Sequence, residues 1–599
     1  MCGIVGYIGK REPKGILYDG LAKLEYRGYD SAGISILEED GAINTQKSVG
    51  KLVNLGNILG GLEMKGHLGI GHTRWATHGK PSTVNSHPHL SGDGRISLVH
   101  NGIIENYAEL REELKAKGHI FLSETDTEVI VHLIEEHYNG DLFDTVKRII
   151  PMLDGAYAIG VFTQDEPERL ITARKGSPLV IGLGEGENLI ASDIPAILEH
   201  TNKVIFLDDG ELAELTRDEV KIYDLEGTPK EKEITEITWS LEASEKGGYD
   251  HFMLKEIFEQ PKAINDTLKA NIEIDLTDKE IEDISRIHIV ACGTSWHAGL
   301  VGKAIIEQEL RIPVEVEVAS EFRYKNPIVT DKDLVILISQ SGETADTLAG
   351  LREAKKHGAK AIGIINVVGS TISREADGTF YTNAGPEIGV ASTKAFVAQL
   401  TALYKFTAFL GRKRGMSQER ADYILDGVAQ LPSKVEAILD EAEHIKNKKE
   451  MFVGVNSTMF IGRGINTAIA LEGALKLKEI SYIHAEGYAS GELKHGPIAL
   501  IDDMCPTVAI ATKSAVYEKT KSNIEEVRAR SGEVLTIATV GDAEAKNYSS
   551  EVIFVPEVDE LFSPVINVIP LQILSYYVAV DRGVDVDKPR NLAKSVTVE

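Results

Sequence analysis

The chain has 599 residues, a formal net charge of −28 at pH 7 and 43% hydrophobic residues. A chain of this length is too long to form a single hydrophobic core, and it predicts three or four domains of about 100–200 residues each. The composition is typical of soluble globular proteins. The negative charge disfavours nucleic acid and anionic membranes as partners, and it requires a site for any phosphorylated substrate to be locally basic or built from backbone N–H groups.

The three cysteines do not form a recognisable framework. Cys2, Cys292 and Cys505 have unrelated spacing, which predicts neither disulfides nor a metal cluster. The N-terminus lacks the basic-then-apolar pattern of a signal peptide, and we expect no apolar run long enough to cross a bilayer. These features predict a cytoplasmic protein.

The first residues, MCGIVGYIG, are the most informative stretch. Removal of Met1 would leave Cys2 with a thiol nucleophile and a free α-amine on one residue. An α-amine titrates near ~7.7–8.0 and can act as the base at neutral pH, so that no separate histidine is required. A lone cysteine near a terminus is no motif by itself, and its interpretation depends on the motifs further along the chain.

From residue 1 to about 238, short alternating strands with turns are interrupted by helical stretches. This pattern predicts an α+β domain in which helices cover antiparallel sheets. The expected strands are 3–9, 33–37, 68–71, 96–99, 156–162 and 204–207, and the expected helices are 105–117 and 126–138. The polar, glycine-containing stretch 242–249 is expected to be a linker.

Two motifs in this half follow apolar strands: 72–79 (HTRWATHG) and 99–106 (VHNGIIEN). An Asn-Gly pair after a strand is usually a tight turn. A thiolate attacking a carboxamide, however, needs donors for the oxyanion, and the Asn101 side chain with the next N–H would supply two. Arg74 could clamp an α-carboxylate. Asp126 could receive an α-ammonium, although it could also be an ordinary residue at a helix start.

Beyond the linker, strands alternate with Gly/Ser-rich loops and helices, which predicts doubly wound parallel sheets. The unit recurs at an almost constant offset. The matching pairs are Gly293 and Gly464 (171 residues apart), Ser320 and Ser490 (170), and Gly369 and Gly541 (172). Chance matches among Gly/Ser loops are the alternative, but the preserved order and spacing favour two copies of one α/β module, at about 290–430 and 458–599.

The two copies differ where the first has SQSGET (339–344) and the second has TKSAV (512–516). Hydroxyls and N–H groups at the start of a helix bind anions, so we predict one phosphate site, in the first copy. The alternative is that Ser339 and Thr344 merely cap a helix.

One predicted helix of the second copy carries charged residues on one face. Glu472, Lys476 and Glu479 share that face by their spacing, whereas apolar residues spread around most of the helix. A solvated ion-pair stripe is the usual interpretation. The surrounding apolar residues instead predict burial, where charges must be paired or used, and a desolvated lysine beside carboxylates could transfer protons.

The motifs together resemble known families. MCGIVGYIG, EYRGYDSAG, GHTRWATHG, HNGIIEN and SETDTE resemble the N-terminal-nucleophile glutamine amidotransferases. ACGTS, ISQSGET, GVASTKAF, EGALKLKEISYIHAEGYASGELKHGP and PRNLAKSVTVE resemble tandem sugar-isomerase (SIS) domains. In this order, the two halves resemble the glutamine–fructose-6-phosphate aminotransferase (isomerizing) family over essentially the whole chain.

The resemblance implies an N-terminal-nucleophile hydrolase domain, an αββα sandwich, over 1–238, a linker over 239–249, and SIS modules over 250–457 and 458–599, the second with a catalytic C-terminal tail. It implies transfer of the glutamine amide nitrogen to fructose 6-phosphate, with isomerization to glucosamine 6-phosphate. No metal, nucleotide or pyridoxal cofactor is expected. His495 is implied to enter the neighbouring subunit's site, so at least a homodimer is expected.

The resemblance also implies roles for individual residues. In the glutaminase half these are Cys2 as nucleophile, Asn101 and Gly102 as oxyanion hole, Arg74 and Asp126 as glutamine ligands, and Trp75 as the gate of an ammonia channel. The implied sugar-phosphate ligands are Ser295, Ser339, Gln340, Ser341, Thr344, Val390 and Ser392. The residues implied in ring opening, imine formation and proton transfer are Glu479, Lys476, His495 and Lys594.

Three other functions compete with this interpretation. Other Cys2-type amidotransferases would need a pyrophosphate-binding loop or an ATP-pyrophosphatase loop, and the second half shows neither. A non-catalytic sugar-phosphate regulator would normally carry a helix-turn-helix domain and a basic surface. A glutaminase-linked deglycating enzyme on the same scaffold is the alternative that the sequence excludes least well.

Overall fold

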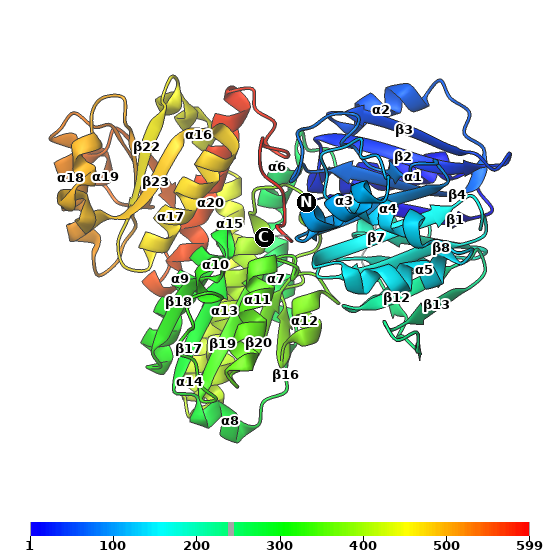
Figure 1. Ribbon diagram of the computed structural model, residues 1–599. Coiled ribbons are helices and arrows are strands. Elements are labelled where there is room, and N and C mark those ends of the chain that lie inside the picture. The colour runs from blue at the N-terminus through cyan, green and yellow to red at the C-terminus, as the bar shows by residue number, and fades with distance from the viewer. Residues whose placement is uncertain (1, 238–244, 598–599) are drawn as a thin grey trace. The chain divides into compact units, whose positions relative to one another are not determined.

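The computed structural model describes residues 2–237 and 245–597. Its contacts divide the chain into two compact units, one of residues 1–244 with 593–599 and one of residues 245–592. Met1 and residues 238–244, which include much of the expected linker, lie outside the described part. Figure 1 shows both units with their elements labelled.

In the first unit, two antiparallel sheets lie between two layers of helices (Figure 1). One sheet has the strand order β15 (Thr235–Glu236), β11 (Lys203–Phe206), β9 (Val180–Leu183), β10 (Glu187–Ala191), β1 (Gly3–Gly9), β4 (Gly66–Arg74), β2 (Ser31–Glu38), β3 (Ile43–Val49). The other has the order β14 (Pro229–Lys230), β13 (Val220–Tyr223), β12 (Glu211–Leu215), β8 (Leu170–Lys175), β7 (Gly155–Thr163), β6 (Ile96–Ile104), β5 (His89–Leu90). The helices are α1 (Pro13–Leu24), α2 (Leu52–Leu59), α3 (Tyr107–Ala116), α4 (Glu128–His137) and α5 (Leu142–Ile149).

Strand β1 shows why this unit folds as a sandwich. Every residue of β1 is buried, because the second sheet covers one face and α1 covers the other. Ile4 and Ile8 belong to a core cluster with Phe162 of the second sheet, whereas Val5 belongs to a cluster with Leu21 of α1. A strand covered on both faces is apolar along its length, and the predicted αββα arrangement is confirmed.

Two strands continue through motifs that were expected to follow them. Arg74 is the last residue of β4, and Asn101 and Gly102 lie inside β6 rather than in a turn after it. Gly102 has a φ of 136°, and a Cβ there would lie 1.9 Å from the carbonyl oxygen of Ala156 on β7. The Asn-Gly pair signals a turn, but pairing with β7 keeps the strand extended because glycine tolerates this geometry.

The second unit contains two parallel sheets (Figure 1). The first has the order β16 (Ile272–Ile274), β21 (Gly378–Tyr381), β20 (Lys360–Ile365), β19 (Asp333–Ser339), β17 (Arg286–Ala291), β18 (Val314–Val318), with β16 antiparallel. The second has the order β23 (His484–Ala489), β22 (Ser457–Gly462), β24 (Thr507–Ala511), β25 (Val534–Thr539), β26 (Glu551–Val555).

Helices surround both of these sheets. Those associated with the first sheet and the stretch after it are α6 (Phe252–Phe258), α7 (Gln260–Lys269), α8 (Asp278–Asp283), α9 (Gly293–Leu310), α10 (Ala319–Phe322), α11 (Ala345–Lys356), α12 (Thr371–Glu375), α13 (Lys394–Lys413), α14 (Gln418–Ala429), α15 (Leu431–Leu439) and α16 (Ala442–Lys446). The helices of the second copy are α17 (Asn466–Ser481), η6 (Ser490–His495), η7 (Pro497–Leu500), α18 (Tyr517–Arg528), α19 (Ala545–Tyr548), η8 (Glu560–Phe562) and α20 (Ser563–Asp581).

The two parallel sheets repeat one topology. Numbered along the chain within each module, the parallel strands of both have the order 2-1-3-4-5, a common doubly wound arrangement. Gly293 and Gly464 follow the first strand of each copy with φ of 54° and 58°. One core cluster nevertheless joins the copies, since it contains Phe396 of α13, Ile469 of α17 and Leu571 of α20. The boundaries that the resemblance implies for the two modules, 250–457 and 458–599, stay predictions.

Helix α20 contradicts the expectation that the chain has no apolar run long enough to cross a bilayer. Among the described residues, Glu560–Asp581 is a helical segment long and apolar enough to cross a membrane, although no such run was expected from the sequence. Of its most apolar window, 94% is buried in the second unit. A core helix passes the same test of length and composition, so this segment is weak evidence for a membrane span.

Candidate active site

A pocket in the first unit gathers most of the residues that the sequence associates with Cys2. It is lined by Cys2, Arg74, Trp75, Thr77, His87, His100, Gly102, Thr125, Asp126 and Thr127. The residue before β1, the end of β4, the middle of β6 and the segment leading into α4 therefore meet at one place.

The Cys2 thiol is half-buried beside the backbone of Trp75. The Trp75 N–H donates to Cys2 Sγ at 3.2 Å, and Asn101 Nδ2 donates to the Cys2 carbonyl oxygen at 3.0 Å. Burial raises the pKa of the Cys2 thiol, and the Trp75 N–H and the Arg74 charge offset only part of this rise. Such a thiol needs a base before it can act as a nucleophile.

Arg74 and Asp126 provide complementary charges in the same pocket. Arg74 Nη2 donates to the carbonyl oxygens of His78 and Gly79, whereas Arg74 Nη1 is buried and finds no hydrogen-bond partner among the described residues. The Asp126 carboxylate accepts from the Ile104 N–H at 2.9 Å. A guanidinium with a spare donor beside a carboxylate suits an amino acid with its charged carboxylate and ammonium groups.

Asn101 is oriented by a histidine that sequence reasoning did not select. His72 Nε2 lies 3.0 Å from Asn101 Oδ1 and 3.0 Å from the His100 carbonyl oxygen. Burial lowers the pKa of His72 to about 3, so its ring is neutral. Because both neighbours of Nε2 are acceptors, Nε2 carries the proton, which fixes Asn101 Oδ1 toward His72 and Asn101 Nδ2 toward Cys2.

In the second unit, the hydroxyl groups after β19 organise their own loop. Ser339 Oγ accepts from the Gly342 N–H at 3.0 Å and lies 3.1 Å from Thr344 Oγ1. Ser341 Oγ accepts from the Glu343 N–H at 3.2 Å. Thr344 is the N-cap residue of α11, but its side chain makes no capping hydrogen bond. Simple helix capping therefore does not account for these side chains.

The corresponding loop of the second copy already contains a protein carboxylate. The Ala515 N–H, in the turn before α18, donates to Glu560 Oε2 at 3.0 Å. The Lys513 N–H donates to Thr539 Oγ1 at 2.8 Å. The backbone N–H groups that could bind a phosphate in this loop therefore already donate to side chains of the same chain.

Glu472 and Lys476 of α17 are buried, as predicted, whereas Glu479 on the same face is only half-buried. Lys476 Nζ lies 2.8 Å from Glu479 Oε2 and 3.5 Å from Glu472 Oε1, and it donates to Thr294 Oγ1 at 3.0 Å. His297 Nδ1 lies 2.7 Å from Glu472 Oε2. Burial acts to lower the pKa of Lys476, but the two carboxylates outweigh it and raise that pKa. Lys476 is therefore a persistent ammonium group, and α9 supplies Thr294 and His297, two residues to which the sequence assigned no role.

The predicted sugar-contacting residues lie on α9 and in the loop before α13. Gln399 Nε2 donates to Ser295 Oγ at 2.9 Å, and Ser392 Oγ donates to Glu387 Oε2 at 2.5 Å. Glu387, which sequence reasoning missed, also accepts from the Thr393 N–H at 2.9 Å. The remaining predicted residues of this group are Gln340, which is half-buried, and Val390, which is buried.

The two other predicted catalytic residues are His495 and Lys594. His495 lies exposed at the end of η6. Lys594 is half-buried in the C-terminal segment 593–599, which belongs to the first unit. Their assignment to the sugar site therefore continues to rest on the resemblance.

Comparisons with known proteins agree with both halves. The glutamine amidotransferase domain family matches residues 37–227, and the SIS domain family matches residues 280–408 and 451–582. Glutamine–fructose-6-phosphate aminotransferases (isomerizing) from Clostridium tetani and Aquifex aeolicus are each 54% identical, over 616 and 600 residues, with full coverage of both chains. The solved C-terminal domain of glucosamine-fructose-6-phosphate aminotransferase from Francisella tularensis is 43% identical, with a TM-score of 0.56, over 57% of this chain and 99% of that one. The chain belongs to the glutamine–fructose-6-phosphate aminotransferase (isomerizing) family.

Proposed function

We propose that this chain hydrolyses glutamine at Cys2 and transfers the released ammonia to fructose 6-phosphate, giving glutamate and glucosamine 6-phosphate. The observation that carries the proposal is the Cys2 pocket, which Cys2, Arg74 and Asp126 line together, with the Asn101 amide oriented against Cys2. The test is incubation with both substrates and detection of both products by mass spectrometry. Glutamate without amino-sugar phosphate would favour the deglycating alternative.

In the glutaminase half-reaction, the Cys2 thiol would attack the carboxamide carbon after its α-amine takes the proton. Arg74 Nη1 would bind the substrate carboxylate, and Asp126 its ammonium group. Asn101 Nδ2 and the Gly102 N–H would stabilise the oxyanion that develops on the carboxamide oxygen. The α-ammonium group would return its proton to the leaving nitrogen, so that ammonia departs and leaves a thioester, which water hydrolyses to glutamate.

His72 is proposed as a positioning residue for this oxyanion hole. We expect His72→Leu to lower kcat for glutamine hydrolysis by about 10–100-fold, with little change in KM. This is less than the ~100–1,000-fold effect of removing an oxyanion donor outright, because Asn101 itself remains. His72→Gln, whose amide can donate to Asn101, should recover part of kcat. Equal losses in the two variants, measured as glutamate formation, would contradict positioning through this hydrogen bond.

In the sugar half-reaction, the loop of residues 339–344 would bind the phosphate of fructose 6-phosphate once per chain. Ser295, Val390 and Ser392 would contact the sugar. Glu479, Lys476, His495 and Lys594 are proposed to open the ring, form the imine and move protons. Because Lys476 stays charged between two carboxylates, its expected contribution is to hold Glu479 in place and to supply positive charge rather than to act as a base.

Replacing Ser341 and Thr344 by alanine together should weaken fructose 6-phosphate binding. Each hydrogen bond to a charged group contributes about 1.5–3 kcal/mol, so loss of both should raise Kd by at least about 100-fold in titration calorimetry. Thr344 makes no capping hydrogen bond, and α11 should therefore remain intact. Ser514→Ala in the second copy is the matched control. Two equivalent sites per chain would contradict the single-site proposal.

Trp75 is proposed to gate the passage of ammonia. Its contact with Cys2 runs through the backbone N–H, which Trp75→Ala retains. We therefore expect this variant to keep glutamine hydrolysis but to form less glucosamine 6-phosphate per glutamate. If Trp75 only packs a core, truncation should cost about 3–5 kcal/mol of stability and lower both activities together. An unchanged product ratio would remove the gate from the proposal.

The proposed state is a cytoplasmic homodimer. His495 is exposed on η6, and Leu500 and Met504, just beyond it, are 58% and 56% exposed. Apolar side chains beside a residue proposed to act in the partner's site are consistent with a subunit interface. A monomer by light scattering at assay concentrations would contradict this.

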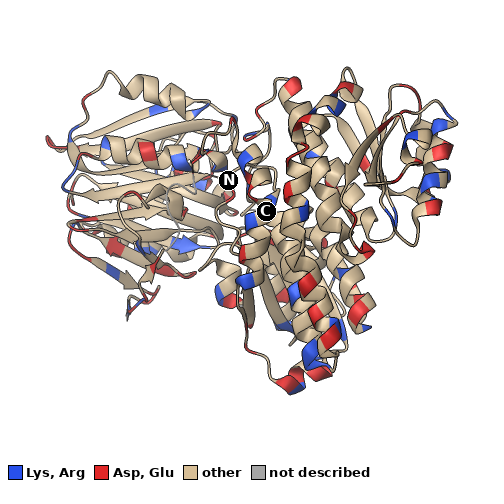
Figure 2. Ribbon diagram, turned by 180° about the vertical axis from the view of Figure 1, so that it is seen from behind, with Lys and Arg blue, Asp and Glu red and all other residues tan. Residues whose placement is uncertain are grey.

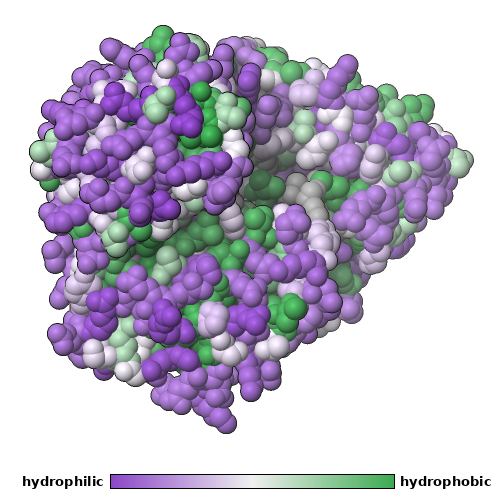
Figure 3. Space-filling model, turned by 90° about the vertical axis from the view of Figure 1, so that its left-hand side faces the viewer, coloured by the Kyte–Doolittle hydropathy of each residue, from purple (hydrophilic) through white to green (hydrophobic). Residues whose placement is uncertain are grey.

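We propose that the chain binds neither nucleic acid nor membranes, because its residues carry a net negative charge and acidic and basic side chains are interspersed. Figure 2 shows acidic and basic residues interspersed over the helices of both units, and acidic residues outnumber basic ones by 92 to 64. On the face drawn in Figure 3, hydrophilic residues cover most of the surface. Such a surface repels polyanions, and retention of the chain on heparin or anionic vesicles at physiological salt would contradict the proposal.

A further inference from the structure

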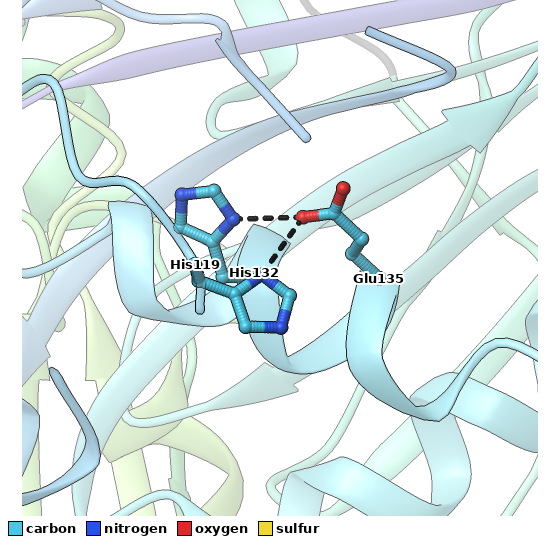
Figure 4. A group of neighbouring side chains, drawn as sticks. All are labelled: His119, His132 and Glu135. Carbon is cyan, nitrogen blue, oxygen red and sulfur yellow. Dashed lines mark hydrogen bonds and ion pairs between the residues drawn. The ribbon is translucent and has the colours of Figure 1, made fainter. Parts of the chain in front are cut away.

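Two histidines and a glutamate meet in the first unit away from the Cys2 pocket (Figure 4). His132 and Glu135 are three residues apart on α4 and therefore share a face, and His119 reaches them from just beyond α3. His119 Nδ1 lies 3.2 Å, and His132 Nδ1 2.8 Å, from the same Oε2 of Glu135. All three ligand atoms lie within 4.8 Å of one another.

We propose that His119, His132 and Glu135 bind one divalent transition-metal ion of the zinc class. Two imidazole nitrogens and one carboxylate oxygen form a known donor set for Zn²⁺, with water in the fourth position. With bonds of about 2.1 Å, adjacent ligands of a tetrahedral ion lie roughly 3.4 Å apart. The two nitrogen–oxygen distances, 3.2 Å and 2.8 Å, are shorter than this value, so side-chain rotations that lengthen them would admit the ion.

The opposite sides of both rings face carboxylates, as is usual for metal-ligating histidines. His119 Nε2 lies 3.1 Å from Glu136 Oε2, and His132 Nε2 lies 3.8 Å from Glu128 Oε1. In the metal-free chain each Nδ1 donates to the Glu135 carboxylate, so a metal ion would displace the two Nδ1 protons, while the carboxylates behind the rings would keep a proton on Nε2. The side chain of His132 is 2% exposed and that of His119 is 12% exposed, so the cluster is largely shielded from solvent.

Glu135 is held in place from a third segment. Its two oxygens accept from the N–H groups of Gly92 and Asp93, at 3.0 Å and 3.2 Å, in the turn between β5 and β6. An ion bound here would link this turn, the segment just beyond α3 and helix α4. Helix α4 begins just after Asp126, which lines the glutamine pocket. The site would therefore stabilise the wall of the glutamine pocket without touching the substrate.

A second group of potential ligands is less suitable. His288, Glu315 and Glu317 lie close together in the second unit, but they include a single imidazole, and both carboxylates approach the same Nδ1. Glu317 also forms an ion pair with Lys325, which supplies the positive charge that a metal ion would bring. The group is explained as an ion-pair cluster, and it serves as an internal comparison.

The test is metal binding by the full-length, untagged chain in a Cys2→Ser background, which removes the pocket thiol as a competing ligand. After treatment with a chelator, the protein is dialysed against micromolar Zn²⁺ and its metal content is measured. We expect one Zn²⁺ per chain, and visible ligand-field absorption when Co²⁺ replaces it. Uptake well below one ion per chain would overturn the proposal.

Three further variants locate the ion. His119→Gln should weaken Zn²⁺ binding more than about 100-fold. Glu136→Gln, which neutralises the carboxylate behind the ring and also removes its ion pair with Lys117, should weaken it by about 10–100-fold. His137→Gln, on the same helix, is the control and should bind like the parent. Circular dichroism verifies folding of each variant, and Zn²⁺ should raise the unfolding temperature of the parent but not that of His119→Gln. Equal Zn²⁺ binding by His119→Gln and the parent would contradict the site.

Discussion

Replacing Cys2 by alanine is expected to abolish glutamine-dependent formation of glucosamine 6-phosphate, with glutamine hydrolysis lowered by at least about a thousandfold. Removal of a covalent nucleophile has effects of this size or larger. Ammonium-dependent synthesis and fructose 6-phosphate binding should persist, because the loop at 339–344 belongs to the other compact unit. Glutamate and amino-sugar phosphate, measured separately with glutamine and with ammonium, distinguish these effects.

The matched control is Cys505→Ala, which alters a buried thiol in a different core cluster. It should retain glutamine hydrolysis. Intact mass should also show that Met1 is removed, since a retained Met1 would place the α-amine of Cys2 in a peptide bond. Undiminished hydrolysis in Cys2→Ala would remove Cys2 as the nucleophile.

Replacing Lys476 by methionine is expected to lower the free energy of unfolding of the second unit by about 3–5 kcal/mol. Lys476 is fully buried, and its removal would leave Glu472 and Glu479 without their ammonium partner. Breaking one side of a buried ion pair has a cost of this order. Synthesis of glucosamine 6-phosphate should be lost, whereas glutamine hydrolysis in the other unit should continue.

Lys478→Met is the control, because Lys478 is exposed on the same helix. A surface substitution of this kind usually changes stability by no more than about 0.5 kcal/mol. Urea denaturation of both variants gives the comparison. Glu479→Gln in the Lys476→Met background should recover part of the stability, since it removes one uncompensated charge. Equal stability of the two lysine variants would contradict a structural role for this network.

Regular periodicity allowed much of the fold to be predicted. The strand expected at residues 3–9 is β1 without change, and the burial of Glu472 and Lys476 followed from apolar residues all around α17. The two-copy pattern was visible because each copy needs a glycine with positive φ after its first strand. Such local requirements can be recognised in one sequence.

Contacts between distant segments could not be predicted in this way. His72 orients Asn101 because β4 and β6 lie in facing sheets, and Glu387 organises the loop before α13 through contacts that no short motif encodes. The continuation of β6 through Gly102 depends on its pairing with β7. Helix α20 was missed because Pro570 and polar residues such as Asn567 and Gln572, all buried, interrupt its apolar run.

The most direct measurement of the central claim follows the amide nitrogen. The chain is incubated with fructose 6-phosphate and glutamine labelled with ¹⁵N in the amide, in the presence of excess unlabelled ammonium, and glucosamine 6-phosphate is isolated for mass spectrometry. Transfer between the two sites without release to solvent predicts ¹⁵N in the amino group. Unlabelled glucosamine 6-phosphate, or labelled ammonium without an amino sugar, would contradict the account.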